Sequence, residues 1–441
     1  MPADPTRASG GSGVPVDPVP VPVPSSVPGP QVTVGAGSSS ASGSAVPAPD
    51  GVRRLNLARV LRLVHEGGPT PRSAVTRTTG LNRSTVGGLV GELERLGLVS
   101  EAESAAVPGA AGRTVGRPSP TVSASSDVVA VALNPEIDEL RAAVVGLDGT
   151  EHLRLRRPLD RVPTADQAVS GLADLVAELR ERLPAAARVA GVGVAVPGIV
   201  RTEDGLVRLA PHLGWHDAPL AARLAAATGL PVRAANDAAL GVRAEQLHGS
   251  ARGHRHVVYV NGGASGIGGG LVVDGVPLGG RDGYAGEIGH AFVDGRDLPC
   301  HCGSRGCLET VVSQERLLRA AGLGPADADR LPEALAAPAP DLADEVDRQL
   351  GFLARALRGV LLTTDPELVV LGGFLGVLHD AAGARLAELV TGQTLAVVAE
   401  GTTLTRAALG SSILLRGAAE LAFDALLADP AGVAPGLVRA R

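Results

Sequence analysis

The chain has 441 residues, of which 45% are hydrophobic, and its formal net charge is −6 at pH 7. This length and apolar content allow a large buried core divided over more than one domain. The sequence contains neither a run of 18 apolar residues nor a signal-peptide pattern, so we expect a cytoplasmic protein without a membrane partner.

The N-terminal part divides into a low-complexity stretch and a basic stretch. Residues 1–51 consist largely of Pro, Gly, Ser, Ala and Val, which predicts a disordered, low-complexity tail. Residues 52–117 contain ten Arg and five Glu, a local charge of 10 − 5 = +5, which leaves −6 − 5 = −11 for the rest. A basic segment on an acidic body indicates that this segment meets a polyanion.

Residues 52–106 have the pattern of a winged helix-turn-helix domain. Apolar residues at helical spacing predict a first helix over 55–64. A second helix is expected to begin at Thr70 and Pro71, because Thr can cap free amides and Pro suits the first helical position. The pattern then breaks at Gly80, which is a typical turn between the two helices of this motif.

The third predicted helix is the recognition helix. Asn82 is its expected cap, and Gly97 can end it in a left-handed conformation. Its buried stripe comprises Val86, Leu89, Val90, Leu93 and Leu96. Its outward N-terminal residues, and two arginines in a wing and linker over 107–126, are the expected DNA contacts, namely Arg83, Ser84, Thr85, Arg113 and Arg117. The alternative is a small helical interaction domain with a solvated arginine face.

From residue 127 onwards, strands alternate with helices. Strands are predicted over 128–133 and 140–147, and a long helix over 165–183. The pattern predicts an α/β body with two lobes. We place the first lobe at 127–245, the second, with returning helices, at 246–425, and a C-terminal tail at 426–441.

All three cysteines lie within eight residues, and a histidine precedes them by ten positions. Three thiolates and one imidazole match the closed tetrahedral shell of a structural zinc site. We therefore expect one Zn2+ per chain, bound by His290, Cys300, Cys302 and Cys307. The alternative is a set of reduced thiols that are unrelated to one another.

Four stretches of the body resemble the ROK family, which contains repressors, uncharacterised frames and sugar kinases. They are Ala235-Asn-Asp-Ala-Ala-Leu-Gly241, Ala264-Ser-Gly-Ile-Gly-Gly-Gly270, Gly286-Glu-Ile-Gly-His290 and Cys300-His-Cys-Gly-Ser-Arg-Gly-Cys-Leu-Glu309. The resemblance covers about residues 52–420. It implies a two-lobed, actin-like or sugar-kinase-like body, and the repressor branch of the family carries an N-terminal winged helix.

The same resemblance implies a sugar site between the lobes. The matching residues are Asn236, Asp237, Glu287, His290 and Glu309. Carboxylates and an amide can bind adjacent sugar hydroxyls, and the two ring nitrogens of His290 could serve zinc and sugar separately. Asp237 matches the general base of the kinases. Without phosphoryl transfer, this residue is better described as a helix cap or a hydrogen-bond partner.

The first phosphate loop departs from the kinase pattern. Kinases of the family carry Asp-x-Gly-Gly-Thr, whereas this chain reads Leu133-Asn-Pro-Glu-Ile-Asp-Glu-Leu140. Pro135 lacks an amide proton, and Glu136 and Asp138 would repel a triphosphate. We therefore expect no catalytic residue and no enzyme. Phe374 is expected to fill the adenine cleft, and Trp215 either lines the sugar cleft or packs inside.

These features predict a sugar-responsive transcriptional regulator, most simply a repressor of carbohydrate uptake or metabolism genes. Its partners would be a sugar or sugar derivative and a double-stranded, palindromic DNA operator read by a homodimer or higher homo-oligomer. One alternative is an ATP-dependent sugar kinase with an added DNA-binding domain. Another is a sugar-sensing scaffold that binds protein rather than DNA.

Overall fold

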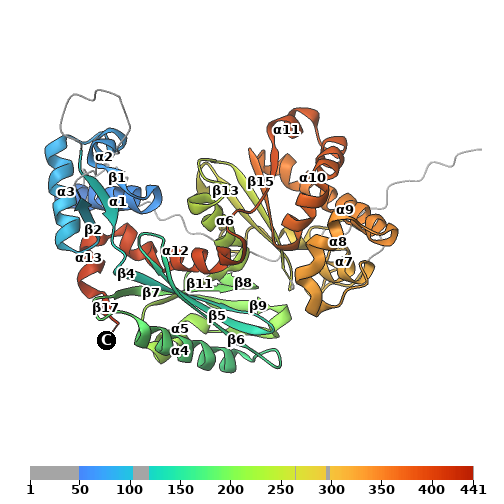
Figure 1. Cartoon of the computed structure of the whole chain (residues 1–441), viewed down its shortest axis with the longest axis horizontal. Helices are drawn as coiled ribbons and strands as arrows, with labels where there is room; N and C mark the ends of the chain where they lie inside the picture. Colours follow the sequence, from blue (N-terminus) through green and yellow to red (C-terminus); the bar gives the residue numbers. More distant parts are fainter. Residues whose placement is uncertain (1–48, 103–118, 264, 295–297, 441) are drawn as a thin grey trace, which may run out of the picture. The chain divides into compact units, whose positions relative to one another are not determined.

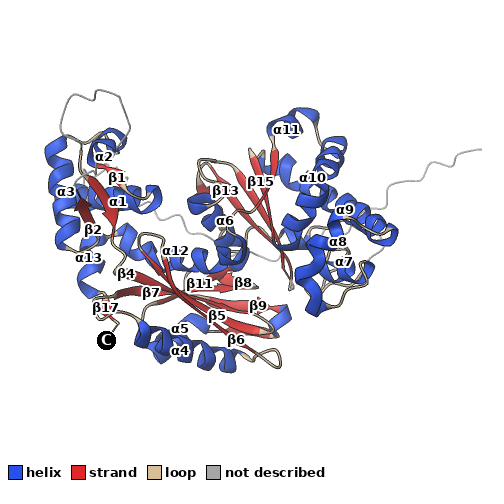
Figure 2. Ribbon diagram, in the orientation of Figure 1, coloured by secondary structure: helices blue, strands red, loops and turns tan. Residues whose placement is uncertain are grey.

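The structure is a computed structural model that describes residues 49–102, 119–263, 265–294 and 298–440 (Figures 1 and 2). The prediction for residues 1–51 therefore lies outside the described residues, apart from its last three positions. Arg113 and Arg117, the two predicted wing contacts, also lie outside them.

The first described residues form three helices and a small antiparallel sheet, as expected for a winged helix. The helices are α1 (Pro49–Gly67), α2 (Arg72–Thr79) and α3 (Arg83–Arg95). The strands, in spatial order, are β1 (Thr70–Pro71), β3 (Thr121–Ala124) and β2 (Val99–Ala102). Helix α1 begins at Pro49, so the expectation that ordered structure starts at residue 52 is wrong by three residues.

The second helix starts differently from its prediction. Thr70 and Pro71 form strand β1 and pair with Val122 and Thr121 of β3. The Thr70 hydroxyl donates to the carbonyl of Gly68 and caps no helix. The hydroxyl of Ser119 instead accepts a hydrogen bond from the Ser73 amide in the first turn of α2. Pairing with a distant strand thus outweighs the local capping preference of Thr70.

The third helix begins and ends where predicted. The side chain of Asn82 accepts a hydrogen bond from the Thr85 amide, and Gly97 has a φ of 66°. The predicted stripe is buried apart from its last member, Leu96, which is half-buried and packs at the edge of the core. Arg83 and Ser84 are exposed at the helix N-terminus, whereas Thr85 is half-buried.

The first lobe is built on a mixed six-stranded sheet. Five of its strands lie in the order β11 (Val232–Asn236), β7 (Arg188–Val196), β4 (Val128–Pro135), β5 (Glu139–Gly146) and β6 (Glu151–Pro158). The sixth strand, β17 (Val438–Arg439), pairs with β7. Helices α4 (Ala165–Arg182) and α5 (Leu220–Thr228) belong to this lobe (Figure 1), as does a small sheet of β8 (Ile199–Arg201), β9 (Leu206–Ala210) and β10 (Trp215–Ala218). Strands β4 and β7 are parallel, and the carboxyl end of β11 leads directly into helix α6 (Asp237–His248).

The second lobe is built on a five-stranded sheet. Its order is β14 (Val276–Pro277), β13 (Gly266–Val273), β12 (Val257–Gly263), β15 (Leu368–Gly372) and β16 (Thr403–Arg406). Its helices are α7 (Gln314–Ala320), α8 (Leu331–Ala336), α9 (Pro340–Thr364), α10 (Gly373–Gln393) and α11 (Ala396–Gly401) (Figure 2). Among the helices of the described ranges, none combines the length and apolarity needed to cross a membrane.

The chain then returns to the first lobe. Helix α12 (Ile413–Ala428) packs against β4, β7 and α6. It is followed by α13 (Pro430–Val433) and β17 (Val438–Arg439). Strand β17 pairs antiparallel with the start of β7, and Ala440 is buried. The expectation of a free tail over 426–441 is therefore wrong, because these residues complete the edge of a sheet.

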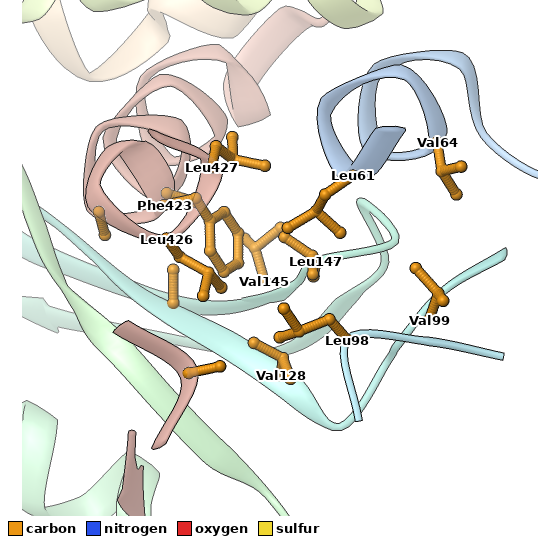
Figure 3. Close-up of a cluster of buried hydrophobic side chains, with 14 of the residues drawn as sticks. Leu61, Val64, Leu98, Val99, Val128, Val145, Leu147, Phe423, Leu426 and Leu427 are labelled. Carbon is orange, nitrogen blue, oxygen red and sulfur yellow. The ribbon is translucent and has the colours of Figure 1, made fainter. Parts of the chain in front are cut away.

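The winged helix and the first lobe share one hydrophobic core (Figure 3). Leu61 of α1 and Leu98 lie near Val128 and Val145 of the sheet and near Leu147, with Phe423 of α12 beside them, and Val64 lies on the side of Val99 (Figure 3). Polar contacts join the same parts. The Arg188 guanidinium donates to the carbonyls of Leu96 and Gly97, and Arg54 of α1 pairs with Asp429. The winged helix is therefore docked on the first lobe through buried side chains.

This shared core predicts a large effect of a single truncation in α1. Leu61 is fully buried, so Leu61→Ala is expected to lower the free energy of unfolding by about 2–5 kcal/mol. Leu55 lies on the same helix with 62% of its surface exposed, and Leu55→Ala should change it by less than about 0.5 kcal/mol. Urea unfolding followed by circular dichroism measures both. Equal effects of the two variants would contradict the shared core.

Candidate metal centre and interlobe cleft

The predicted metal ligands converge at one point in the second lobe. His290 ends the short helix η2 (Ile288–His290), and Cys307 immediately precedes η3 (Leu308–Thr310). The donor atoms of His290, Cys300, Cys302 and Cys307 all lie within 4.8 Å of one another. Cys302 Sγ is 3.8 Å from Cys307 Sγ, and Cys300 Sγ is 3.7 Å from His290 Nδ1. A tetrahedron with metal–sulfur bonds of about 2.3 Å has edges of about 3.8 Å, so these four residues fit a tetrahedral metal site.

The loop carrying the cysteines is held as a tight knuckle by its own backbone. The Cys300 amide donates to the Ser304 carbonyl, and the Gly303 amide donates to the Cys300 carbonyl. Burial raises the pKa of the Cys300 and Cys307 thiols above the ordinary value. A metal bound here would therefore displace protons from thiols that otherwise keep them.

The five residues expected to bind sugar line one small cavity between the lobes. Its volume is about 70 Å³, and its wall includes Asn236, Asp237, Glu287, His290 and Glu309. The first two stand at the junction of β11 and α6, and the others come from the segments around η2 and η3. The structure therefore brings these five residues together in one place, although they span more than 70 positions of the sequence.

Asn236 and Asp237 are fixed by the start of helix α6. The Asn236 side chain accepts from the Ala239 amide as the helix cap, and its Nδ2 donates to the Gly198 carbonyl. Asp237 Oδ1 accepts from the amide of Ala238. Each side chain keeps further hydrogen-bonding capacity for a ligand, because an amide and a carboxyl group can each make more bonds than these.

The cleft is crowded with carboxyl groups, which perturbs their protonation. Burial, the nearby Glu136 and the nearby Glu287 raise the pKa of Asp237 to about 7. Burial also raises the pKa of Glu287, which His290 partly offsets. At neutral pH, Asp237 is therefore poised between a neutral form that can donate a hydrogen bond and an anion that can only accept.

His290 connects the metal cluster to the cleft. Its Nδ1 faces Cys300, whereas its Nε2 lies 3.8 Å from a carboxylate oxygen of Glu287. Glu309 is held from the same side, since the Cys300 thiol donates to its Oε1 at 2.9 Å. The cluster thus fixes the orientation of two side chains in the cleft wall.

The sequence pattern missed His212, whereas the packing alternative stated for Trp215 is confirmed. His212 lies in the short helix η1 (Pro211–Leu213) and lines the cavity, with its ring 4.9 Å from that of His301. Trp215, three residues later, does not line the cleft; it is buried in the first-lobe core and donates to the Pro163 carbonyl. The sequence Pro-His-Leu-Gly indicates a turn at His212, but it does not show in which direction the imidazole ring points.

The turn that would hold phosphate in a kinase is closed by its own backbone. Strands β4 and β5 leave only Glu136, Ile137 and Asp138 between them, and the Glu136 amide donates to the Glu139 carbonyl. Phe374 is buried against Gly262 and lines a cavity of about 800 Å³. That Phe374 fills an adenine cleft stays a prediction.

Comparisons with known proteins match most of the chain. The profile described as ROK family matches residues 136–425. The glucokinase of Thermotoga maritima is 37% identical over 217 residues, which are 45% of this chain and 68% of that protein. The xylose repressor of Bacillus subtilis is 28% identical over 270 residues, which are 61% of this chain and 68% of that protein.

A solved structure extends this likeness beyond the body. The crystal structure of a ROK family transcriptional regulator, a homolog of the Escherichia coli MLC protein, superposes with a TM-score of 0.70 at 26% identity. The superposition covers 85% of this chain and 98% of the chain of that regulator. Residues 136–425 are 290 of 441 residues, so a match over 85% must also include residues outside the profile. The similarity thus reaches beyond the two-lobed body.

The metal cluster predicts a bound ion that one substitution removes. Purified protein is expected to carry one divalent metal ion per chain, and Cys302→Ser should lose it and lower the thermal midpoint. Ser304→Ala changes the same loop without touching a donor atom and should keep the ion. Elemental mass spectrometry measures the stoichiometry. A fully folded wild-type protein without metal would contradict the assignment.

The raised pKa of Asp237 predicts a pH-dependent gain of stability on replacement. Between about pH 4 and 7 the folded state holds a proton that the unfolded state has lost, so wild-type stability falls as pH rises through this window. Asp237→Asn avoids this loss. It should unfold like wild type near pH 4 and be more stable by on the order of 4 kcal/mol at pH 8.

Thermal and urea unfolding at both pH values test this expectation. Asp329→Asn is the matched control, because Asp329 is exposed in the second lobe. An equal gain at pH 4 and pH 8 would mean that protonation of Asp237 is not the cause.

Proposed function

The chain belongs to the ROK family, and we propose that it is a cytoplasmic, sugar-responsive, DNA-binding transcriptional regulator that represses genes of carbohydrate uptake or metabolism. The observation that carries the proposal is the winged helix docked on the two-lobed body through a shared core. Phosphoryl transfer does not require such an element, whereas a repressor requires a DNA-binding domain that is coupled to its ligand-binding domain.

The DNA contacts would come from the N-terminal end of α3. Arg83 and Ser84 are exposed there, next to the capping residue Asn82. An arginine at this place can pair bidentately with guanine or with a phosphate, and the positive end of the helix dipole favours phosphate. Thr85 is half-buried beside them, and Arg113 and Arg117 would add wing contacts to the minor groove.

The ligand would be a sugar or sugar derivative bound in the cleft. Asn236, Asp237, Glu287, His290 and Glu309 offer both donors and acceptors to neighbouring hydroxyls. We propose that the metal is a structural zinc ion, one per chain, held by His290 and the three cysteines. Bound zinc would neutralise thiolate charge and fix the His290 ring, and it would anchor Cys307, two residues before Glu309 in the chain.

The regulator would act without catalysis and as a homodimer. In the turn at 136–138 the Glu136 amide already donates to the Glu139 carbonyl, and the turn presents carboxylates where a kinase binds phosphate. Both features support a non-enzymatic body. A two-fold dimer would place two α3 helices on a palindromic operator whose half-sites are separated by whole helical turns.

An ATP-dependent sugar kinase with an added DNA-binding domain is the second candidate. The cavity of about 800 Å³ beside Phe374 favours it, because that volume accepts a nucleoside. The identity with a glucokinase over 217 residues points the same way. Formation of ADP that requires both ATP and D-glucose, and that is lost in Asp237→Asn, is the result that decides for the kinase.

DNA binding supplies the direct test of the proposal. A duplex selected by the protein from a random pool should bind with an affinity that falls steeply with added salt. Arg83→Ala should weaken binding roughly tenfold or more, because one bidentate contact is lost. Arg358→Ala removes the same charge from an exposed position of α9 and should leave affinity unchanged. Failure to select any duplex would contradict the proposal and favour a protein-binding scaffold.

A further inference from the structure

A buried carboxylate joins three elements at the junction of the winged helix and the body. Glu420 of α12 places Oε2 2.8 Å from His65 Nε2 and Oε1 2.7 Å from His248 Nε2. The side chains of His65 and Glu420 are 1% and 3% exposed. His65 belongs to α1, and His248 is the last residue of α6. A single carboxylate therefore connects the DNA-reading domain with the helix that starts in the cleft.

The hydrogen bonds of this group indicate that His65 is charged. Its Nδ1 lies 2.6 Å from the carbonyl of Leu147, and a carbonyl can only accept, so Nδ1 carries a proton. The two histidines lower the pKa of the Glu420 carboxyl, although burial acts in the opposite direction. Glu420 in turn raises the pKa of His65 against the lowering effect of burial. An ionised carboxylate accepts only, so Nε2 of His65 carries a proton as well. Breaking this pair would leave a charge buried without a partner.

Helix α6 connects this pair rigidly to the cleft. It begins with Asn236 as its cap and Asp237 as its first residue, and it ends at His248 about 18 Å away. Its backbone lies so close to α12 that a Cβ at Gly417 would collide with the carbonyl of Leu240. Arg243 of α6 also pairs with Asp424 of α12. A displacement at the cleft end is therefore passed to the histidine end, because close-packed helices do not deform continuously.

We propose that Glu420 and His248 are positioning residues that link occupancy of the cleft to the placement of the winged helix, through His65. A ligand that moves Asp237 moves α6, and the Glu420 carboxylate, shared by both histidines, passes this movement to α1. The inference rests on the proposed function, since it concerns how the same cleft acts on the same DNA-binding element. A ligand changes DNA affinity only to the extent that it binds the two placements differently.

The test measures coupling rather than stability. The Kd of wild-type protein for its selected duplex is determined without sugar and with each of a panel of aldohexoses and aldopentoses that includes D-glucose and D-xylose. The ratio of the two Kd values for an active sugar is expected to be about 5 to 150. In His248→Gln this ratio should lie between about 0.5 and 2, which means that the sugar no longer changes DNA affinity. Calorimetry should show an unchanged affinity for the sugar. Helix α1 stays anchored in this variant by the hydrogen bond between His65 and Glu420.

Two further variants separate coupling from folding. Glu420→Gln keeps the side-chain volume, removes the shared charge and should lose the ratio as well. His254→Gln breaks another His–Glu pair of the second lobe, between His254 and the exposed Glu367, and should keep it. A full ratio in His248→Gln and Glu420→Gln would overturn the link and leave the regulator intact. A wild-type protein whose DNA affinity no sugar changes would overturn both the link and the proposed function.

Discussion

The packing of α12 is the constraint on which the other parts of the molecule depend. This helix comes from the end of the chain and lies against the sheet of the first lobe, against α6 and against α1. The approach to the sheet is so close that a Cβ at Gly193 of β7 would collide with the carbonyl of Ala418. Because one helix contacts all three partners, a shift of α12 would reach both the cleft and the winged helix.

The metal cluster solves a different problem, which is how to hold side chains at the end of short, irregular segments. Helices η2 and η3 have only three residues each and could not fix His290 and Glu309 by their own hydrogen bonds. The four donor atoms that converge on one point can hold these segments in place, as a longer helix would do through its backbone hydrogen bonds. The cluster lies beside the cleft wall that it braces, whereas α6 supports the opposite wall.

The sequence predicts local features well and the meeting of distant segments poorly. The cap at Asn82, the end of α3 at Gly97 and the strands after residue 127 follow from signals within a few residues. The metal donors and cleft residues could be assigned because their spacing and neighbours form specific motifs. Thr70, the segment after residue 425 and His65 could not, because each is set by a partner at least 50 residues away. Periodicity shows that His65 faces inward, but not that a carboxylate 355 positions later meets it.

Glu136, in the turn between β4 and β5, connects the proposed absence of a phosphate site with the chemistry of the cleft. Glu136 presents a carboxyl group where a triphosphate would need donors, and burial raises its own pKa. The same carboxyl group is the second cause, after burial, of the raised pKa of Asp237. A carboxyl group with a pKa near 7 is about half ionised at neutral pH, and such a value also suits a general base, so this pKa does not by itself separate a base from a recognition group. A carboxyl group that keeps its proton part of the time can also donate to a sugar oxygen and accept from a sugar hydroxyl. Glu136 thus acts on both features: it places a carboxyl group in the phosphate turn and raises the pKa of Asp237, and the first of these is the one that supports the proposed non-catalytic body.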